Sequence, residues 1–256
     1  MCSLVLPVYL KNAITHAVMK FDAPCIRGRP RLLSTIETLQ QVFYVARTGC
    51  QWSNITPPRN VSYKTVFARF ANWSKIGVFE TAFSGLAKLA GDRASRRRSV
   101  LCTDTSYVKN IQGRVPTLGR NHTDRGRKAT KVSVLTDDKG IPLHFCFHPA
   151  NKNDCTLLRH LLDSASRCIG PLGRFQSLYA DKGYDSQTCR TLCSLHGIDA
   201  QIPKRGQPEG WGTVRYVVER TFANLDLFRR IILRYDAKIV HFKSFHFLAG
   251  CYLVGK

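Results

Sequence analysis

One stretch decides the fold: Leu178-Tyr-Ala-Asp-Lys-Gly-Tyr-Asp-Ser186. Its first three residues are typical of the end of a short buried strand, and Lys182-Gly183 marks a turn directly after Asp181. A helix is expected next, with Asp185 or Ser186 as its cap. An aspartate beside a glycine turn most often only forms the turn or the cap. A carboxylate at the end of a strand also faces the crevice in which α/β folds bind ligands. Asp181 is therefore a candidate functional residue.

Two more acidic residues lie in unusual positions along the chain. Asp104 falls within Ser99–Val108, where apolar and polar residues alternate as in a half-buried strand. A carboxylate in the middle of a strand is disfavoured, so Asp104 needs a functional reason. Glu219 lies on a predicted late helix, beside its apolar stripe. Together with Asp181, these residues suggest one acidic site.

The order of predicted elements places these acids in one fold. Strand, hairpin, helix, strand, helix, short strand and helix follow one another, an order that predicts a mixed α/β core of the ribonuclease-H-like type. Its first and fourth strands are neighbours, and the late helix packs across their ends, so Asp104, Asp181 and Glu219 are expected to converge. Three uncompensated carboxylates repel one another, and two divalent cations would relieve this; Mg²⁺ suits carboxylate and phosphate oxygens. The remaining predicted elements of the core are the hairpin Lys131–Thr136 and Ile141–His148, a helix capped by Asn153 or Asp154, Ser177–Ala180, Gln187–Leu195 and Asp199–Ile202.

The first hundred residues show helical periodicity instead. Apolar residues from Leu32 to Ala46 form one helix face, and Gly49 supplies a stop. Ser62 is the expected cap of a second helix, and a third is expected from Phe79 to Gly91. A DNA-reading unit of the helix-turn-helix type would have this composition, although the aromatic residues are core residues by default.

Three segments are expected from the change of pattern after Arg98. Residues 1–26 are an N-terminal extension without a clear pattern, expected to be partly loose. Residues 27–98 form a helical DNA-binding domain that ends in a basic linker, and residues 99–256 form the catalytic domain. A last apolar helix around Phe245–Val254 closes the chain.

The charge of the chain points to a polyanionic partner. Lys and Arg number 39 against 17 Asp and Glu, which gives a formal net charge of +22. Nucleic acid is the leading partner, an acidic membrane surface the second and simple solubility the third. No apolar run approaches the ~18 residues of a membrane-spanning helix, and no signal peptide is expected. The ten cysteines include no C-x-x-C pair, so reduced, mostly buried thiols are expected.

Six motifs together resemble the DDE transposases of bacterial insertion sequences, in the group typed by insertion sequence 5. Three of them surround the acids: Asp104-Thr-Ser, Ala180-Asp-Lys-Gly-Tyr-Asp-Ser186 and Val218-Glu-Arg-Thr-Phe-Ala-Asn-Leu-x-x-Phe-Arg-Arg230. Three lie in the helical region: Arg27-Gly-Arg-Pro-Arg31, Arg47-Thr-Gly-Cys-Gln-Trp52 and Thr65-Val-Phe-x-Arg-Phe-x-x-Trp73. The resemblance covers about residues 27–250.

The resemblance implies a metal-dependent transposase that cuts DNA at terminal inverted repeats and joins the 3′ ends to target DNA. It implies that Asp104, Asp181 and Glu219 are the catalytic metal ligands, with two Mg²⁺ ions for which Mn²⁺ can substitute. Double-stranded DNA is the implied partner, and a homodimer or larger assembly is expected on it. In a bacterial host, the protein would be cytoplasmic or associated with the nucleoid.

Basic residues are the expected DNA contacts. Arg215 matches the arginine of the family signature one helical turn before Glu219, and Lys131 matches a family position near the core. The arginines of the Arg27–Arg31 arm either follow a phosphate backbone or belong to a solvated linker. The full expected set is Arg215, Lys131, Lys204, Arg29, Arg31, Lys64, Arg69 and Arg97.

Two departures from the family signature keep other functions open. Gly212 stands where the signature has Tyr, and Asp226 stands where it has Lys or Arg. Both changes would remove DNA contacts, which favours a domesticated or decaying transposase that binds DNA without cutting it; the complete acid triad opposes this. A nuclease acting on RNA–DNA hybrids fits the predicted core but not the helical front.

Overall fold

The computed structural model describes residues 6–22, 30–111, 118–121, 124–204 and 212–255, which form two compact units. One unit comprises Met1–Gly85 and Leu225–Lys256, and the other comprises Leu86–Asn224. Residues 225–256, predicted as part of the catalytic domain, group with the helical unit because their aromatic side chains complete its core. Whether residues 27–98 and 99–256 are independent domains, as the sequence predicts, is a separate question from this division into compact units, and it stays a prediction.

The first unit is helical. Helix α2 begins at a capping box in which Ser34 Oγ accepts from the Glu37 amide at 3.1 Å, while Glu37 accepts from the Ser34 amide at 2.8 Å. Gly49, with a φ of +70°, ends it, and Ser62 caps α3, as the sequence predicts. Its helices are α1 (Val8–Phe21), α2 (Thr35–Thr48), α3 (Tyr63–Lys75), α8 (Arg229–Ile232) and α9 (Ile239–Val254), with the 3₁₀ turns η1 (Trp52–Asn54) and η2 (Pro58–Asn60) and the short strand β7 (Leu233–Arg234). Helix α4 (Val78–Arg96) begins in this unit and continues into the second.

Two helices differ from the sequence prediction. No element was predicted within residues 1–26, but the structure has α1 there, whose Leu10, Ile14 and Val18 recur every four residues and are buried. The third predicted helix was expected to stop at Gly91, but α4 continues to Arg96. A Cβ at Gly91 would lie 3.1 Å from Nη2 of Arg174. This glycine therefore makes room for the side chain of Arg174 and does not end the helix.

Aromatic side chains form the core of the first unit. The rings of Phe70 and Phe245 stack with centroids 4.7 Å apart, and Trp52 lies 5.1 Å from Phe70. Phe43 packs edge-on against Phe228 at 5.8 Å. Such pairs each add about 0.5–1.5 kcal/mol beyond area burial. The C-terminal residues are thus integral to the core around α2 and α3.

The second unit is built on a mixed sheet. Its strands follow the order β2-β3-β1-β5-β6. β4 also pairs with β3, at residues 130–136, which follow the residues 127–129 that pair with β2. β1 is antiparallel to β3 and parallel to β5, which is parallel to β6. The first and fourth predicted strands are therefore neighbours, as expected. The bounds are β1 (Leu101–Asn110), β2 (Gly119–Asn121), β3 (Arg127–Asp137), β4 (Pro142–Pro149), β5 (Ser177–Ala180) and β6 (Asp199–Gln201).

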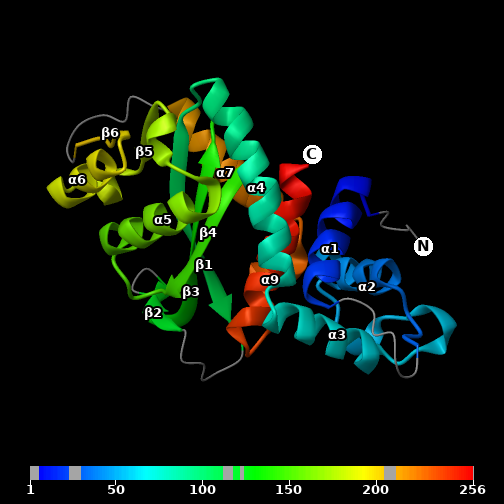
Figure 1. Ribbon diagram of the computed structural model, residues 1–256. Helices are drawn as coiled ribbons and strands as arrows, with labels where there is room; N and C mark the ends of the chain where they lie inside the picture. Colours follow the sequence, from blue (N-terminus) through cyan, green and yellow to red (C-terminus); the bar gives the residue numbers. More distant parts are fainter. Residues whose placement is uncertain (1–5, 23–29, 112–117, 122–123, 205–211, 256) are drawn as a thin grey trace. The chain divides into compact units, whose positions relative to one another are not determined.

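Helices cover both faces of this sheet. α5 (Asp154–Ile169) lies on one face and α7 (Gly212–Asp226) on the other, while α6 (Gln187–Leu195) follows β5 (Figure 1). α5 buries a stripe made of Leu157, Leu158, Leu161, Leu162, Ala165 and Ile169. Two 3₁₀ turns, η4 (Leu172–Arg174) and η5 (Lys182–Tyr184), precede and follow β5. This mixed α/β arrangement is the ribonuclease-H-like core that the element order predicts.

The thiols agree with the expectation from composition. The eight cysteines in the described ranges are all free, and four of them, Cys102, Cys146, Cys189 and Cys193, are buried in the second unit. None of the helices described here is long and apolar enough to cross a membrane.

Candidate active site

Asp104 on β1 and Asp181 directly after β5 occupy adjacent backbone positions, because these two strands are parallel neighbours. The register pairs Thr103 of β1 with Ala180 of β5, and each aspartate is the next residue along its chain. Paired strands lie about 4.8 Å apart, so the two backbones bring these carboxylates to one place at the end of β5. Asp181 is the residue at which β5 gives way to η5. The structure thus brings together two of the three predicted acids.

The direction of Asp104 follows from its neighbour. Oγ1 of Thr105 lies 3.3 Å from Oδ1 of Asp154, at the start of α5. Successive side chains of a strand point to opposite faces of the sheet. Asp104 therefore points to the face covered by α7, which lies across the sheet from α5 (Figure 1). Its Oδ1 accepts a hydrogen bond from the Thr105 amide at 2.7 Å.

Glu219 is exposed on α7, on the same face of the sheet. The helix is held to the hairpin between β3 and β4, where Oγ1 of Thr221 donates to the Gly140 carbonyl at 2.8 Å. Nη2 of Arg220 donates to the Lys139 carbonyl at 2.7 Å. Contact between α7 and the hairpin thus sets the position from which Glu219 faces solvent.

The three acids do not form a tight cluster. Within the described ranges, only Cys146, His148 and His160 make a group of three potential ligands whose atoms all lie within 4.8 Å of one another. Carboxylates without a cation repel one another, and divalent cations held by these acids would relieve that repulsion. Three carboxylates are also the hard oxygen donors that Mg²⁺ or Mn²⁺ binds. The donor set fits a divalent cation.

An ion pair between a buried lysine and a half-buried aspartate supports the strands beneath Asp104 and Asp181. Lys131 of β3 is 2% exposed, and its Nζ lies 2.8 Å from Oδ1 of Asp154 and 2.9 Å from the Lys152 carbonyl. Burial lowers the pKa of Lys131, but hydrogen bonds to Asp154 and Tyr107 outweigh it, and the pKa is raised overall. These bonds direct the ammonium of Lys131 into the protein. The DNA contact predicted for Lys131 is not tested by them and stays a prediction.

Tyr184, which sequence reasoning missed, is buried close enough to this ion pair and to Asp104 for both to affect its pKa. It lies in η5, three residues after Asp181, and is 3% exposed. Burial, followed by the charges of Asp154 and Asp104, raises the pKa of Tyr184 well above its usual value. The sequence did contain one signal for this buried polar group: Lys131 places a charge in a largely apolar strand, and such a charge needs a buried partner.

Some predicted DNA contacts lie on the surface. Lys64 and Lys204 are exposed. Arg31 is exposed as well, with Nη2 2.7 Å from Oδ1 of Asp22. Arg29 and the side chain of Arg215 lie outside the described part of the structure. Lys64 and Lys204 are the predicted contacts most directly available to a phosphate.

Arg69, in contrast, is engaged within the helical unit. Its side chain is 13% exposed, and its guanidinium donates to the Leu33 carbonyl and to Oγ1 of Thr35, both at 2.9 Å. The guanidinium also lies 4.8 Å from the ring centroid of Trp73. These contacts hold α3 to the start of α2, so Arg69 has a structural role whether or not it touches DNA.

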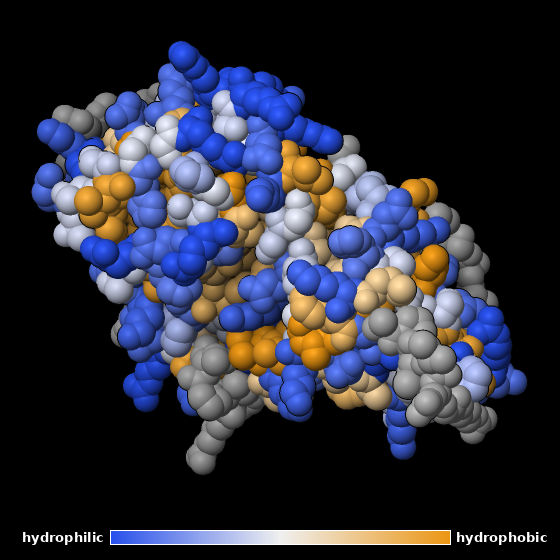
Figure 2. All heavy atoms as spheres, viewed as in Figure 1, coloured by the Kyte–Doolittle hydropathy of each residue, from blue (hydrophilic) through white to orange (hydrophobic). Residues whose placement is uncertain are grey.

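A cluster of arginines marks the end of α4. Arg93, Arg96, Arg97 and Arg98 are all exposed, and hydrophilic side chains gather over this end of the helix (Figure 2). Nη2 of Arg97 lies 3.6 Å from a carboxylate oxygen of both Asp137 and Asp138. The other three arginines give this end a strong positive potential.

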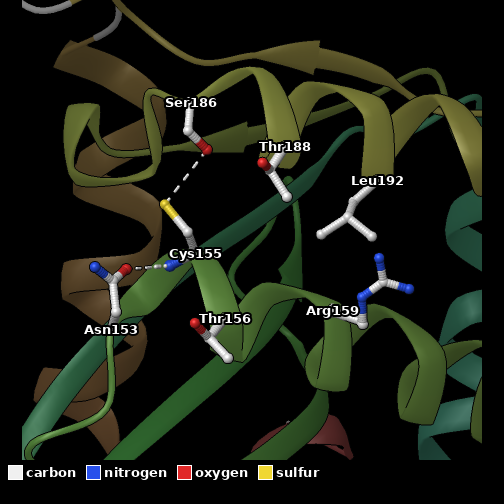
Figure 3. A pocket seen from close by; sticks show the side chains of 7 residues that line it. All are labelled: Asn153, Cys155, Thr156, Arg159, Ser186, Thr188 and Leu192. Atoms are coloured by element: carbon white, nitrogen blue, oxygen red, sulfur yellow. Dashed lines mark hydrogen bonds between the residues drawn. The ribbon is translucent and has the colours of Figure 1, made fainter.

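A cavity of about 420 Å³ opens between the first turns of α5 and α6. Figure 3 shows the caps of both helices at its edge, with Oδ1 of Asn153 accepting from the Cys155 amide and Ser186 beside the Cys155 thiol. Helix N-termini and the guanidinium of Arg159 favour anions. The remaining lining residues are Thr156, Thr188 and Leu192.

Comparison with known families matches nearly the whole chain. Residues 96–254 match a family model described as "Transposase DDE domain", and residues 14–83 match one described as "Putative transposase of IS4/5 family". The chain is 37% identical over 196 residues to the "Putative transposase for insertion sequence element IS402" of Burkholderia cepacia. That alignment covers 73% of this chain and 89% of the relative.

Two solved structures give weaker similarities. The pre-cleavage Mos1 transpososome is 10% identical with a TM-score of 0.31, over 97% of this chain and 86% of the Mos1 chain. The Mos1 mariner paired end complex with Mn is 12% identical with a TM-score of 0.30, over 96% and 86%. These low TM-scores carry no weight for fold or function. The family model and the 37% identical relative do, and the chain belongs to the DDE transposases, enzymes that cleave DNA and transfer the cut strands.

Proposed function

We propose that the chain acts at the terminal inverted repeats of its own element and that Asp104, Asp181 and Glu219 are its catalytic metal ligands. Mg²⁺ is the proposed ion, with Mn²⁺ as a substitute. The 3′ ends released by cleavage are joined to target DNA. Residues 27–98 recognise the element ends, and residues 99–256 carry out the chemistry.

The adjacency of Asp104 and Asp181 supports this proposal most directly. Two carboxylates at neighbouring backbone positions repel each other, and their oxygens match the preference of Mg²⁺. Glu219 supplies a third carboxylate from the helix on the face to which Asp104 points. In a chain with a net charge of +22, a local acidic group has a specific purpose.

The chemistry divides between the acids and the basic surface. When bound, paired cations activate the attacking oxygen and stabilise the leaving oxygen of an in-line phosphoryl transfer. Asp104 and Asp181 fix the position of that reaction, because Asp104 lies on β1 and Asp181 directly follows β5, its parallel neighbour. Exposed basic residues, including Lys204 and the arginines at the end of α4, hold the phosphate backbone nearby.

Two element ends must be processed together, so we propose that the enzyme works as a homodimer or larger assembly on DNA. Each protomer would contribute one acidic site. In a bacterial host, this places the protein in the cytoplasm or on the nucleoid, where its DNA substrate lies.

A second candidate function is DNA binding without cleavage. Gly212 begins α7, and Asp226 is its exposed last residue. The family signature has side chains that contact DNA at both positions. Gly212 has no side chain to make such a contact, and Asp226 carries a negative charge in place of a positive one. A decaying or domesticated transposase would keep its fold and its acids while losing such contacts.

Amide substitutions test the proposed site. Asp104→Asn, Asp181→Asn and Glu219→Gln each remove one charged ligand with little change of shape. Cleavage of terminal-repeat DNA with Mg²⁺ should fall by several orders of magnitude in each variant. The triple variant should be no worse than the singles, because residues that act as a unit are not additive. DNA affinity should persist or rise, since negative charge is removed from a surface that faces phosphates.

Asp199→Asn is the matched control, because Asp199 is an exposed acid on the edge strand β6. It should cleave like the wild type. Cleavage by the wild type in the presence of chelator, or near-normal cleavage by Asp181→Asn, would contradict the proposed site. A wild type that binds the repeats but never cleaves them would support the second candidate.

A further inference from the structure

A cluster of sulfur and imidazole ligands lies on the outer strand β4, away from the acids. His144, Cys146 and His148 alternate along β4, so their side chains point to one face. α5 covers that face and contributes His160 and Ser164. β3 separates β4 from β1, so this cluster is distinct from the site formed by Asp104 and Asp181.

The distances within the cluster are those of potential metal ligands. Sγ of Cys146 lies 3.4 Å from Nδ1 of His160, and the rings of His148 and His160 are 5.0 Å apart at an interplanar angle of 88°. Ligand atoms of Cys146, His148 and His160 all lie within 4.8 Å of one another. Tetrahedral Zn²⁺, with Zn–S of about 2.3 Å and Zn–N of about 2.0 Å, requires sulfur and nitrogen about 3.5 Å apart. One pair already has this spacing, and small side-chain rotations would close the rest.

The surroundings give the cluster both rigidity and access. Cys146 is buried and His160 is exposed, so an ion can enter from solvent and reach a thiol inside. The Cys146 thiol also lies 3.3 Å from Oγ of Ser164, which in turn donates to the His160 carbonyl at 2.6 Å. Such an outer hydrogen bond orients a ligand and tunes its basicity.

We propose that Cys146, His148 and His160 form a binding site for Zn²⁺ or a similar borderline-soft transition metal. Thiolate and imidazole select such ions over Mg²⁺, so the site differs in chemistry from the acidic one. Three protein ligands leave the fourth tetrahedral position to water. Bound metal would tie the edge strand β4 to α5 and so stabilise the second unit. Binding requires loss of the Cys146 proton, so affinity rises with pH.

Cobalt spectroscopy on the full chain tests this proposal. Metal-free, reduced protein should bind Co²⁺ with a visible band of tetrahedral geometry and a near-ultraviolet thiolate-to-cobalt charge-transfer band, saturating at one equivalent. Zn²⁺ should displace the cobalt and raise the midpoint of thermal unfolding. Cys146→Ser, which keeps a hydrogen-bonding group, should abolish the charge-transfer band.

His160→Gln provides a second variant, chosen because an exposed position tolerates substitution. It should weaken Co²⁺ affinity on the order of tenfold or more, with unchanged circular dichroism. Cys168→Ser and His196→Gln are the controls, since both residues lie outside the cluster, and both should bind like the wild type. A wild type without the charge-transfer band, or a band that survives Cys146→Ser, would overturn the proposal and leave a hydrogen-bonded thiol.

Discussion

At the scale of single residues, charges inside apolar strands have separate causes. Asp104 lies at the site where chemistry is proposed, whereas Lys131 is buried to pair with Asp154. Both stand out in the sequence for the same reason, because a charge in a strand is costly unless it has a partner. The structure separates them by which face of the sheet each side chain takes.

Lys131→Met should destabilise the protein strongly. Methionine fills similar space but leaves Asp154 without its ammonium. Since the Asp154 side chain is 30% exposed, the loss should be about 1–3 kcal/mol of unfolding free energy. Urea unfolding followed by circular dichroism measures this. Lys128→Met, at an exposed position on the same strand, should change stability little. The double variant Lys131→Met with Asp154→Leu removes the unpaired carboxylate and should recover stability. If it were less stable than Lys131→Met alone, the loss in the single variant would have another cause.

His246 should make the protein acid-sensitive. This residue of α9 is 3% exposed, and burial lowers its pKa to about 4. The unfolded chain takes up the proton near pH 6.5 and the folded chain only near pH 4, so stability is full above 6.5 and falls between these values. The slope is about 1.4 kcal/mol per pH unit. His246→Gln should reduce the slope by one proton in urea titrations from pH 7 to 4; an unchanged slope would mean that His246 protonates equally in both states.

At the scale of elements, the hairpin between β3 and β4 positions α7. Gly140 sits in the turn with a φ of +77°, and a Cβ there would lie 2.8 Å from Oγ1 of Thr221 and 3.1 Å from the Val217 carbonyl. The helix that carries Glu219 therefore rests on a residue without a side chain. The close approach explains why this turn needs glycine for space as well as for conformation.

Gly140→Ala should lower stability and DNA cleavage together. Its positive φ costs roughly 1–2 kcal/mol for alanine, and the clash with α7 adds about 1–3 kcal/mol. Gly126→Ala is the control, because Gly126 has a φ of +72° and nothing within 4 Å of the added carbon. Urea unfolding and repeat-DNA cleavage measure both. Equal losses in the two variants would show that α7 does not depend on this contact.

Local signals predicted most elements, but long-range contacts decided the rest. The capping signal at Ser186 predicted where α6 begins, because such signals act within one turn, and the helix has the predicted bounds Gln187–Leu195. α1 begins without a side-chain cap and so gave no comparable signal. In the site, the adjacency of Asp104 and Asp181 depended on which strands pair. Cys146 and His160 meet only because α5 folds over β4, so no spacing rule in the sequence could find them.

At the scale of the whole molecule, charge is the dominant property. The net charge of +22 is distributed over both compact units, with exposed basic residues such as Lys64 in one and Lys204 in the other. Arg69 and Lys131 contribute to the same total but are held by internal bonds. Net charge alone therefore overstates the number of residues available to DNA.

Binding to duplex DNA should depend steeply on salt, with each neutralised phosphate contributing about −0.9 to the slope of log affinity against log salt concentration. Fluorescence anisotropy at several salt concentrations measures the slope. Lys64→Gln and Lys204→Gln should each make it shallower by about 0.9, because an exposed ammonium releases one counterion when it meets a phosphate. Lys128→Gln is the control, as an exposed lysine that is not among the predicted contacts. A wild-type slope near zero would remove nucleic acid as the main partner. Slopes unchanged in the Lys64 and Lys204 variants alone would place the DNA on other basic residues, with the arginines at the end of α4 the next to test.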